Sequence, residues 1–335
     1  MKNIGLPIRN RGGVWVKLKL PEKTLNQDLR DMLNLMNELD AAAIFDPEIR
    51  KSFLECRALN AKHGKTYFLA TRLLPKAKRP FVHALYGFAR FADEIVDDLN
   101  SPLNFDERVA KFKMWKHQTQ ADLKSNKSDD PVVKALIFTI NRFEIDLAYF
   151  DAFLKSMEMD LTVSEYQTFE DLMEYVYGSA SVIGLQMVPI LGATDLKQAS
   201  EAAEALGTAF QLANFIRDVG EDLDRGRIYL PISELKQFGV TPESLKERVV
   251  TPQLREALKF QINRVRELQR KADRGIPLLY PESRPCIEAA SELYCGIVDE
   301  VENINYEIFN KRAKTSNFRR VKVALPALIR AWSVR

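Results

Sequence analysis

Cysteine and histidine are scarce in this sequence, with three residues of each among 335. Three scattered thiols are too few for a disulfide framework or a zinc site. The histidines are not paired at zinc-ligand spacing, and none is an evident partner for a nucleophilic cysteine. These residues are Cys56, Cys286, Cys295, His63, His83 and His117. We therefore expect buried, inert thiols in a reducing compartment, and we predict a cytoplasmic protein.

Other common signals are missing as well. The sequence contains neither a GxxxxGK[ST] loop nor a GxGxxG motif after a strand pattern, so nucleotide-binding folds are not indicated. The most apolar stretch, residues 182–193, is interrupted by Gln186 and Pro189 and is too short to span a bilayer. No signal-peptide core follows the basic residues near the N-terminus. A net charge of +3 is too small to indicate a nucleic acid partner.

Glycine and proline are infrequent, at 14 and 15 residues, whereas Leu, Ala, Glu, Lys and Arg dominate long stretches. This composition favours helices over a sheet rich in turns. Clusters of helix-ending residues, such as 125–131 and 192–195, divide the chain after residue 55 into eight or more helices. We predict an all-α fold with one main domain over residues 51–335 and a helical extension over residues 1–50. The extension has the helical pattern Leu25, Leu29, Leu33, Met36 and Leu39.

The end of the chain carries basic charge only. Residues 311–335 contain eight Lys or Arg and no acidic residue. Apolar residues alternate with them, namely Val323, Leu325, Leu328, Ile329 and Trp332. Two interpretations stay open. The segment could rest peripherally on an anionic membrane surface, or it could be a last helix whose apolar side packs on the body and whose basic side is solvated.

Two acidic motifs indicate chemistry, DEIVD at 93–97 and DVGED at 218–222. Each places two aspartates four residues apart, hence on one face of a helix with Cβ atoms about 5 to 6 Å apart. A lone pair of this kind is usually a solvated helix face. Here the preceding residues are apolar, and burying two like charges requires a counter-ion. Mg²⁺ is the hard cation that carboxylates, water and phosphate oxygens bind together, and Mn²⁺ is an alternative.

Polar residues extend both motifs along their helices. At spacings of three or four lie Gln211, Asn214, Asp218 and Asp222 on one helix, and Tyr86, Arg90, Asp93 and Asp97 on the other. Arg90 could bind phosphate oxygens through two N–H groups at once. The sequence lacks the residues for a zinc site, a cysteine nucleophile or a nucleotide-binding loop. We therefore predict metal-assisted ionisation of a diphosphate.

At these motifs the sequence resembles the squalene/phytoene synthase family, and its phytoene synthase branch in particular. The resemblance extends from about Ala61 to Trp332. It rests on KTYFLATRLLP at 65–75, KRPFVHALYGFARFADEIVD at 78–97, YVYGSASVIG at 175–184, QLANFIRDVGEDLDRGRIYLP at 211–231 and GIPLLYPESRPCIEAASELY at 275–294. Ala89 departs from the pattern, since many relatives have Cys there, but this is not a ligand position. The resemblance implies a single-domain helical isoprenoid synthase fold with a central cavity.

The resemblance also implies roles for individual residues. Asp93, Asp97, Asp218 and Asp222 would bind bridging magnesium ions, with Asn214 and Glu221 in support. Diphosphates would be bound by Arg90, Arg217, His63, Lys65 and Thr66, and by either Lys311 or Arg312. Tyr86, Tyr175 and Tyr294 would line the reaction cavity, and Gln211 would lie near the cationic intermediate.

Some of these residues have purely structural interpretations. His63, Lys65 and Thr66 could begin and cap a helix. Tyr175 could be a core aromatic whose hydroxyl finds a partner, and Arg217 could pair with Glu221 at helical spacing.

The activity that the resemblance implies is head-to-head condensation of two geranylgeranyl diphosphates, through prephytoene diphosphate, to phytoene without NADPH. Small residues within 178–184 and 203–209 could leave room for a long chain, but they could equally serve close helix packing. A farnesyl diphosphate-using dehydrosqualene or squalene synthase therefore stays open. A catalytically silent assembly or binding protein of the same fold would have lost the aspartates, and both pairs are intact here.

Overall fold

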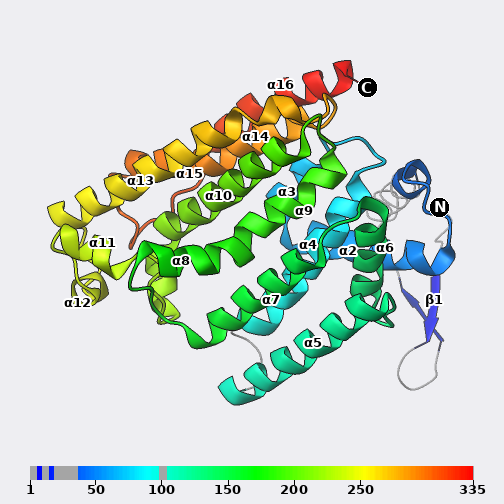
Figure 1. Ribbon diagram of the computed structural model, residues 1–335, viewed down its shortest axis with the longest axis horizontal. Coiled ribbons are helices and arrows are strands. Elements are labelled where there is room, and N and C mark those ends of the chain that lie inside the picture. The colour runs from blue at the N-terminus through cyan, green and yellow to red at the C-terminus, as the bar shows by residue number, and fades with distance from the viewer. Residues whose placement is uncertain (1–5, 10–14, 19–36, 98–103, 335) are drawn as a thin grey trace.

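The computed structural model describes residues 6–9, 15–18, 37–97 and 104–334. The described chain is almost entirely helical, which confirms the all-α prediction (Figure 1). The first elements are β1 (Leu6–Arg9), β2 (Trp15–Leu18), α2 (Pro47–His63), α3 (Lys65–Thr71), α4 (Arg79–Asp97), α5 (Phe105–Ser125), α6 (Pro131–Phe143), α7 (Leu147–Thr162) and α8 (Phe169–Val176). There follow the π-helical turn η1 (Tyr177–Ser181), α9 (Val182–Leu191), α10 (Leu196–Asp224), α11 (Ile232–Gln237), α12 (Pro242–Lys246), α13 (Pro252–Asp273), the 3₁₀ turn η2 (Ile276–Leu278), α14 (Arg284–Cys295), α15 (Ile297–Asn303) and α16 (Asn317–Ser333).

Side-chain caps explain where several helices begin. Asp130 accepts a hydrogen bond from the backbone N–H of Val132 at 2.8 Å, and Pro131 follows at the first position of α6. Asn104 and Glu107 form a reciprocal capping box at the start of α5. The predicted breaks at 125–131 and 192–195 fall between helices, as expected.

The long helix α10 lies at the centre of the fold. It packs against α9 and η1 on one side and against α13 on the other. Figure 1 shows α10, α13 and α14 running side by side in one half of the molecule, with α4, α7 and α9 in the other half. One cluster of buried apolar residues joins α2, α4, α6, α7 and α9, and a second joins α8, α10, α13 and α15. None of the described helices is both long and apolar enough to cross a bilayer.

Residues 37–41, just before α2, form a helical segment that is docked on the core. Leu39 and Ile44 are almost fully buried, and Glu38 is only 4% exposed. Oε1 of Glu38 lies 2.7 Å from Nη1 of Arg79, and Oε2 lies 3.6 Å from Nε of Arg57. Because α2 begins at Pro47, the boundary expected after residue 50 falls inside a helix.

The earlier part of the extension contains a pair of strands that the sequence analysis did not predict. β1 and β2 pair antiparallel, with Leu6 opposite Leu18 and Arg9 opposite Trp15. The helical pattern from Leu25 to Met36 lies outside the described residues.

Replacing Glu38 with alanine is expected to lower the free energy of unfolding by about 3 kcal/mol or more, because two arginines would lose a buried carboxylate. The matched control is Asp40→Ala. The Asp40 side chain is 56% exposed and pairs with Arg50, so we expect a loss below about 1 kcal/mol. Chemical denaturation measures both. Equal losses would contradict a structural role for the buried pair.

Candidate active site

The two aspartate motifs face one polar pocket, of about 350 Å³, between α4 and α10. The helix α4 contributes Tyr86, Arg90 and Asp93, and α10 contributes Gln211, Asn214, Arg217, Asp218 and Asp222. Ala89, where the family pattern has Cys, also lines this pocket. The side chain of Asp97 is not among those that the structure describes. The structure thus brings together the residues of both polar stripes that it describes.

Arginines hold the carboxylates of this pocket. Nη1 of Arg90 lies 2.6 Å from Asp93, and Nε of Arg217 lies 2.7 Å from Asp218. Arg312, which is 94 residues further along the chain than Asp218, approaches the same carboxylate at 3.2 Å and Glu221 at 3.0 Å. The alternative pair Arg217–Glu221 is therefore not formed. Each arginine is placed to bind an anion that enters beside the aspartates.

The Asp222 carboxyl is held partly protonated by its surroundings, so its ionisation would respond to a cation in the pocket. Burial, together with the neighbouring charge of Asp218, raises the pKa of Asp222 to about 7. A divalent cation would restore the ionised form. Among the described residues, no three carboxylate, imidazole or thiol groups converge as a preformed metal site. Mg²⁺ needs no such cluster, because it keeps waters and takes one or two carboxylates plus substrate phosphate oxygens. The donor set of this pocket therefore fits magnesium.

A second polar group on the pocket wall was missed by the sequence analysis. The carboxylate of Asp160, in α7, accepts hydrogen bonds from the hydroxyls of Tyr175 and Tyr229, both at 2.9 Å. Nη2 of Arg227 donates to the backbone carbonyl of Asp160 at 2.8 Å. Burial and the Asp160 charge raise the pKa of Tyr175 well above its ordinary value, so that this hydroxyl stays protonated and donates. Tyr175 is thus a buried aromatic and a pocket residue at once.

Replacing Tyr175 with phenylalanine is expected to lower the free energy of unfolding by about 1.5 to 3 kcal/mol, because a buried hydrogen bond to a charged group is lost. Tyr177→Phe is the matched control, since Tyr177 lies two residues further on and is 41% exposed. Its stability is expected to equal that of the wild type in the same denaturation experiment. If both variants match the wild type, the bond to Asp160 contributes nothing.

An apolar cavity of about 260 Å³ adjoins the polar pocket. Ser179 and Asn214 line both, so the two spaces meet at these residues, and Asn214 lies one helical turn before Asp218. Small residues make the cavity, including Ala180, Gly184, Ala202, Ala203 and Gly207. Aromatic residues border it near the polar end, where Phe210 packs on Tyr294 with ring centroids 4.9 Å apart.

Some of these small residues also serve close helix packing, and the room that they leave for a long chain stays a prediction. A Cβ on Gly207 would lie 2.5 Å from the carbonyl oxygen of Ala180, although Gly207 lines the cavity. Gly178 lines no part of the cavity and lies directly against the backbone of Ala152 in α7.

A third, basic compartment of about 490 Å³ completes the site. It shares Tyr86 and Arg217 with the polar pocket, and Tyr67 and Tyr294 with the apolar cavity. Its basic lining residues are His63, Arg217, Arg312, Lys314 and Arg320. Lys314 and Arg320 were not predicted. Lys311, the alternative to Arg312, is not among the lining residues.

The predicted group of His63, Lys65 and Thr66 lies at the junction of α2 and α3. His63 ends α2 and its Nε2 lies 3.2 Å from Glu94, which in turn contacts Arg90 at 3.3 Å. Lys65 and Thr66 begin α3, which has Gly64 at its N-cap and no side-chain cap. The capping interpretation of Thr66 is therefore not supported. Nothing is described of the Lys65 and Thr66 side chains, and their role stays a prediction.

Fold and site together define a helical enzyme with a carboxylate-rich pocket opening on an apolar cavity. The sequence model described as squalene/phytoene synthase matches residues 60–319. The 15-cis-phytoene synthase of Synechococcus elongatus is 35% identical over 294 residues, which is 84% of this chain and 94% of that protein. Phytoene synthase 1, chloroplastic, of Arabidopsis thaliana is 32% identical over 335 residues, 93% of this chain and 77% of that protein.

Solved structures agree with the sequence relatives. A dehydrosqualene synthase in complex with ligand superposes with a TM-score of 0.76 at 29% identity, covering 85% of this chain and 98% of the other. Squalene synthase HpnC from Alicyclobacillus acidocaldarius gives a TM-score of 0.72 at 25% identity, covering 79% and 98%. The chain belongs to the squalene/phytoene synthase family. It is a prenyltransferase of the kind that condenses prenyl diphosphates head to head.

Proposed function

We propose that this enzyme joins two geranylgeranyl diphosphates, through prephytoene diphosphate, to phytoene. The observation that carries the proposal is the arrangement of the site, in which a pocket with residues of both aspartate motifs opens on an apolar cavity. Arg90, Arg217 and Arg312 contact the carboxylates of this pocket. Relatives about 35% identical that are named phytoene synthases support geranylgeranyl diphosphate over farnesyl diphosphate.

The polar residues would bind the diphosphates and control the leaving group. Asp93, Asp97, Asp218 and Asp222 would hold Mg²⁺, which as a Lewis acid stabilises the charge of a departing diphosphate. Asn214, beside them, would support the same site, and Glu221 would act through its contact with Arg312. Arg90, Arg217 and Arg312 would exchange their carboxylate contacts for phosphate oxygens.

The apolar part of the site would control the carbon chemistry. The carbon–oxygen bond of one substrate breaks and releases its diphosphate, and the double bond of the second substrate attacks the resulting allylic cation. Loss of a first proton, which released diphosphate can accept, closes the ring of a cyclopropyl diphosphate. After a second ionisation the skeleton rearranges and loses a proton. The aromatic faces of Tyr86, Tyr294 and Phe210 can stabilise the cations, while the cavity excludes water.

The last proton would leave to released diphosphate. Tyr175 and Tyr229 donate to Asp160, and the pKa of each hydroxyl is raised by burial, so neither is a ready base. Gln211 lies in the same pocket, with Nε2 3.4 Å from Ser179 Oγ, where its amide dipole could face the cationic intermediate.

Two predictions on context accompany the proposal. Residues 51–335 would be the catalytic domain and residues 1–50 an extension of unassigned purpose. The three cysteines are buried free thiols, which suits the predicted reducing, cytoplasmic compartment.

The test is to incubate the purified chain with geranylgeranyl or farnesyl diphosphate and identify the hydrocarbon by mass spectrometry, with and without Mg²⁺ and NADPH. We expect phytoene from geranylgeranyl diphosphate with Mg²⁺ alone. If only farnesyl diphosphate gives a product, farnesyl diphosphate would be the substrate, and the proposed mechanism would stand. The absence of any product would favour a silent binding protein of the same fold.

A further inference from the structure

The C-terminal helix α16 shows an unusual distribution of apolar residues. Its inward face, packed on α14, consists of small or medium residues, with Val323, Ala327 and Ala331 buried. Its large apolar residues point outward, namely Phe318 (80% exposed), Val321 (61%), Leu325 (55%), Ile329 (59%) and Trp332 (66%). These five, the outward stripe, recur at spacings of three and four and thus share one face. An ordinary surface helix would bury such residues and expose polar ones.

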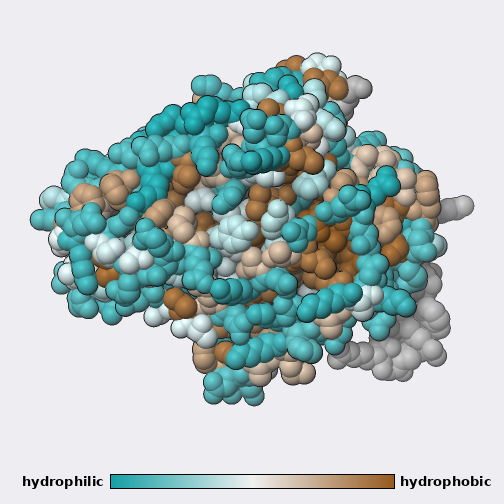
Figure 2. Space-filling model, in the orientation of Figure 1, coloured by the Kyte–Doolittle hydropathy of each residue, from teal (hydrophilic) through white to brown (hydrophobic). Residues whose placement is uncertain are grey.

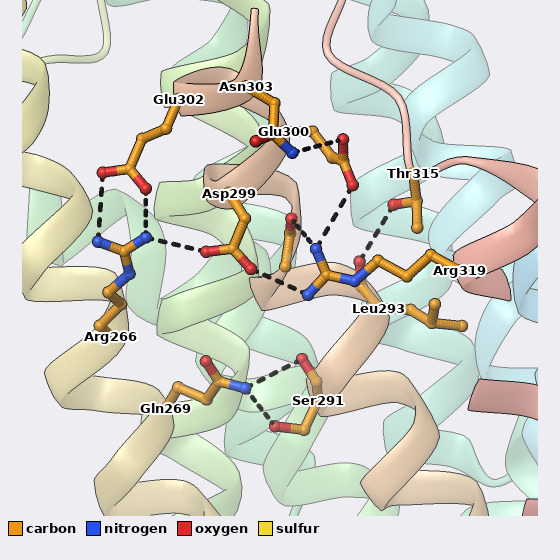
Figure 3. Close-up of polar contacts among 11 residues, drawn as sticks. Arg266, Gln269, Ser291, Leu293, Asp299, Glu300, Glu302, Asn303, Thr315 and Arg319 are labelled. Atoms are coloured by element: carbon orange, nitrogen blue, oxygen red, sulfur yellow. Dashed lines mark hydrogen bonds and ion pairs between the residues drawn. The ribbon is translucent and has the colours of Figure 1, made fainter. Parts of the chain in front are cut away.

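Ion pairs fix the orientation of this helix. Asp299 lies between two arginines, with Oδ1 2.9 Å from Arg266 and Oδ2 2.9 Å from Arg319 (Figure 3). Arg319, in the first turn of α16, also contacts Glu300 at 3.4 Å. Towards the other end, Arg330 lies 3.1 Å from Glu288 of α14. Because α16 is anchored at both ends, the outward stripe is a defined surface of the molecule. Figure 2 shows hydrophobic atoms at the outer edge of α16, at the upper right.

Charge around the stripe identifies its partner. Residues 311–335 carry eight Lys or Arg and no acidic residue. Arg312, Arg319 and Arg330 contact carboxylates of other elements, whereas Lys322, beside the stripe, and Lys314 are exposed. Two copies of this face would bring a net positive charge against another, which disfavours self-association. An anionic lipid surface offers an apolar layer for the stripe and negative headgroups for the basic side chains.

We propose that the outward stripe of α16 lies in the interface of an anionic membrane and docks the enzyme there. The docked helix also forms part of the site, since Arg320, next to Arg319, lines the basic compartment. If the proposed function holds, docking places this compartment beside the lipid in which prenyl chains and a hydrocarbon product dissolve.

The test is co-sedimentation of the full chain with phosphatidylcholine vesicles, with or without phosphatidylglycerol. The triple variant Leu325→Ser/Ile329→Ser/Trp332→Ser removes much of the stripe, and its affinity for anionic vesicles is expected to fall roughly tenfold or more. The matched control is Met114→Ser on α5, where Met114 is 74% exposed. It should bind as the wild type does. Added salt should weaken wild-type binding.

Three outcomes would overturn the proposal: equal binding by the wild type and the triple variant, no wild-type binding to anionic vesicles, or a wild-type dimer that the triple variant dissociates without any vesicle binding. Product formation from detergent-solubilised prenyl diphosphates should be unchanged in the triple variant. The vesicle-binding assay contains no substrate. It therefore tests membrane docking even if the proposed function is wrong.

Discussion

Replacing Asp218 with alanine is expected to lower kcat/KM for the prenyl diphosphate about a thousandfold or more, which corresponds to roughly 4 kcal/mol of transition-state stabilisation. Asp218 has two roles at the centre of the polar pocket. It is a proposed magnesium ligand, and it binds both Arg217 and Arg312. Its loss would remove a charge that attracts the cation and would release two arginines from their positions beside the leaving group. Steady-state kinetics with saturating Mg²⁺ measures the effect.

The control for this variant lies on the same helix. Asp224 is 65% exposed, pairs with Arg248 and does not line the pocket, so Asp224→Ala should keep wild-type kinetics. Asp93→Ala on α4 should match Asp218→Ala, because the proposed magnesium site takes ligands from both helices. Melting curves of all three should stay close to the wild type. Full activity in either pocket variant would remove the basis for the metal assignment.

Filling the apolar cavity is expected to change which substrate is used. Asn214, at the polar end, and Ala199, at the far end, are both on α10 and line the cavity. They are fifteen positions apart, hence about 22 Å along the helix at 1.5 Å per residue. Ala203 lies between them, nearer the far end. If the proposed substrate lies along α10, a phenylalanine at position 203 would block the part of the cavity that its fourth isoprene unit would occupy.

For Ala203→Phe we expect turnover of geranylgeranyl diphosphate to fall about a hundredfold or more, with farnesyl diphosphate affected less than about tenfold. Glu204→Phe is the control, because Glu204 follows Ala203 directly, is exposed and does not line the cavity. Competition between the two substrates, with products separated by mass, gives the ratio directly. An unchanged ratio would mean that the prenyl chain lies elsewhere.

Much of the helical fold could be predicted because its signals are local. Asp130 before Pro131, and Asn104 three residues before Glu107, mark helix starts through bonds that span at most a few residues. The aspartate pairs were found for the same reason, since spacing along one helix determines a shared face. That both helices face one pocket then followed from the resemblance alone.

The missed residues depend on contacts between distant segments. Asp160 has no motif of its own, and its partner Tyr229 is 69 positions away. Lys314 and Arg320 reach the basic compartment only because the chain before α16 and its first turn pack beside α14 and α15. Which face of α16 is buried could not be predicted either. Both faces carry apolar residues, and only packing against the rest of the chain determines the buried one.

The most direct test of the central claim is a crystal structure with Mn²⁺ and a non-ionisable thiodiphosphate analogue of the substrate. We predict anomalous density for Mn²⁺ between the aspartates of α4 and those of α10, the diphosphate against Arg90, Arg217 and Arg312, and the prenyl chain in the cavity along α10. Metal bound to one aspartate pair alone, or an analogue whose chain lies outside that cavity, would contradict the account.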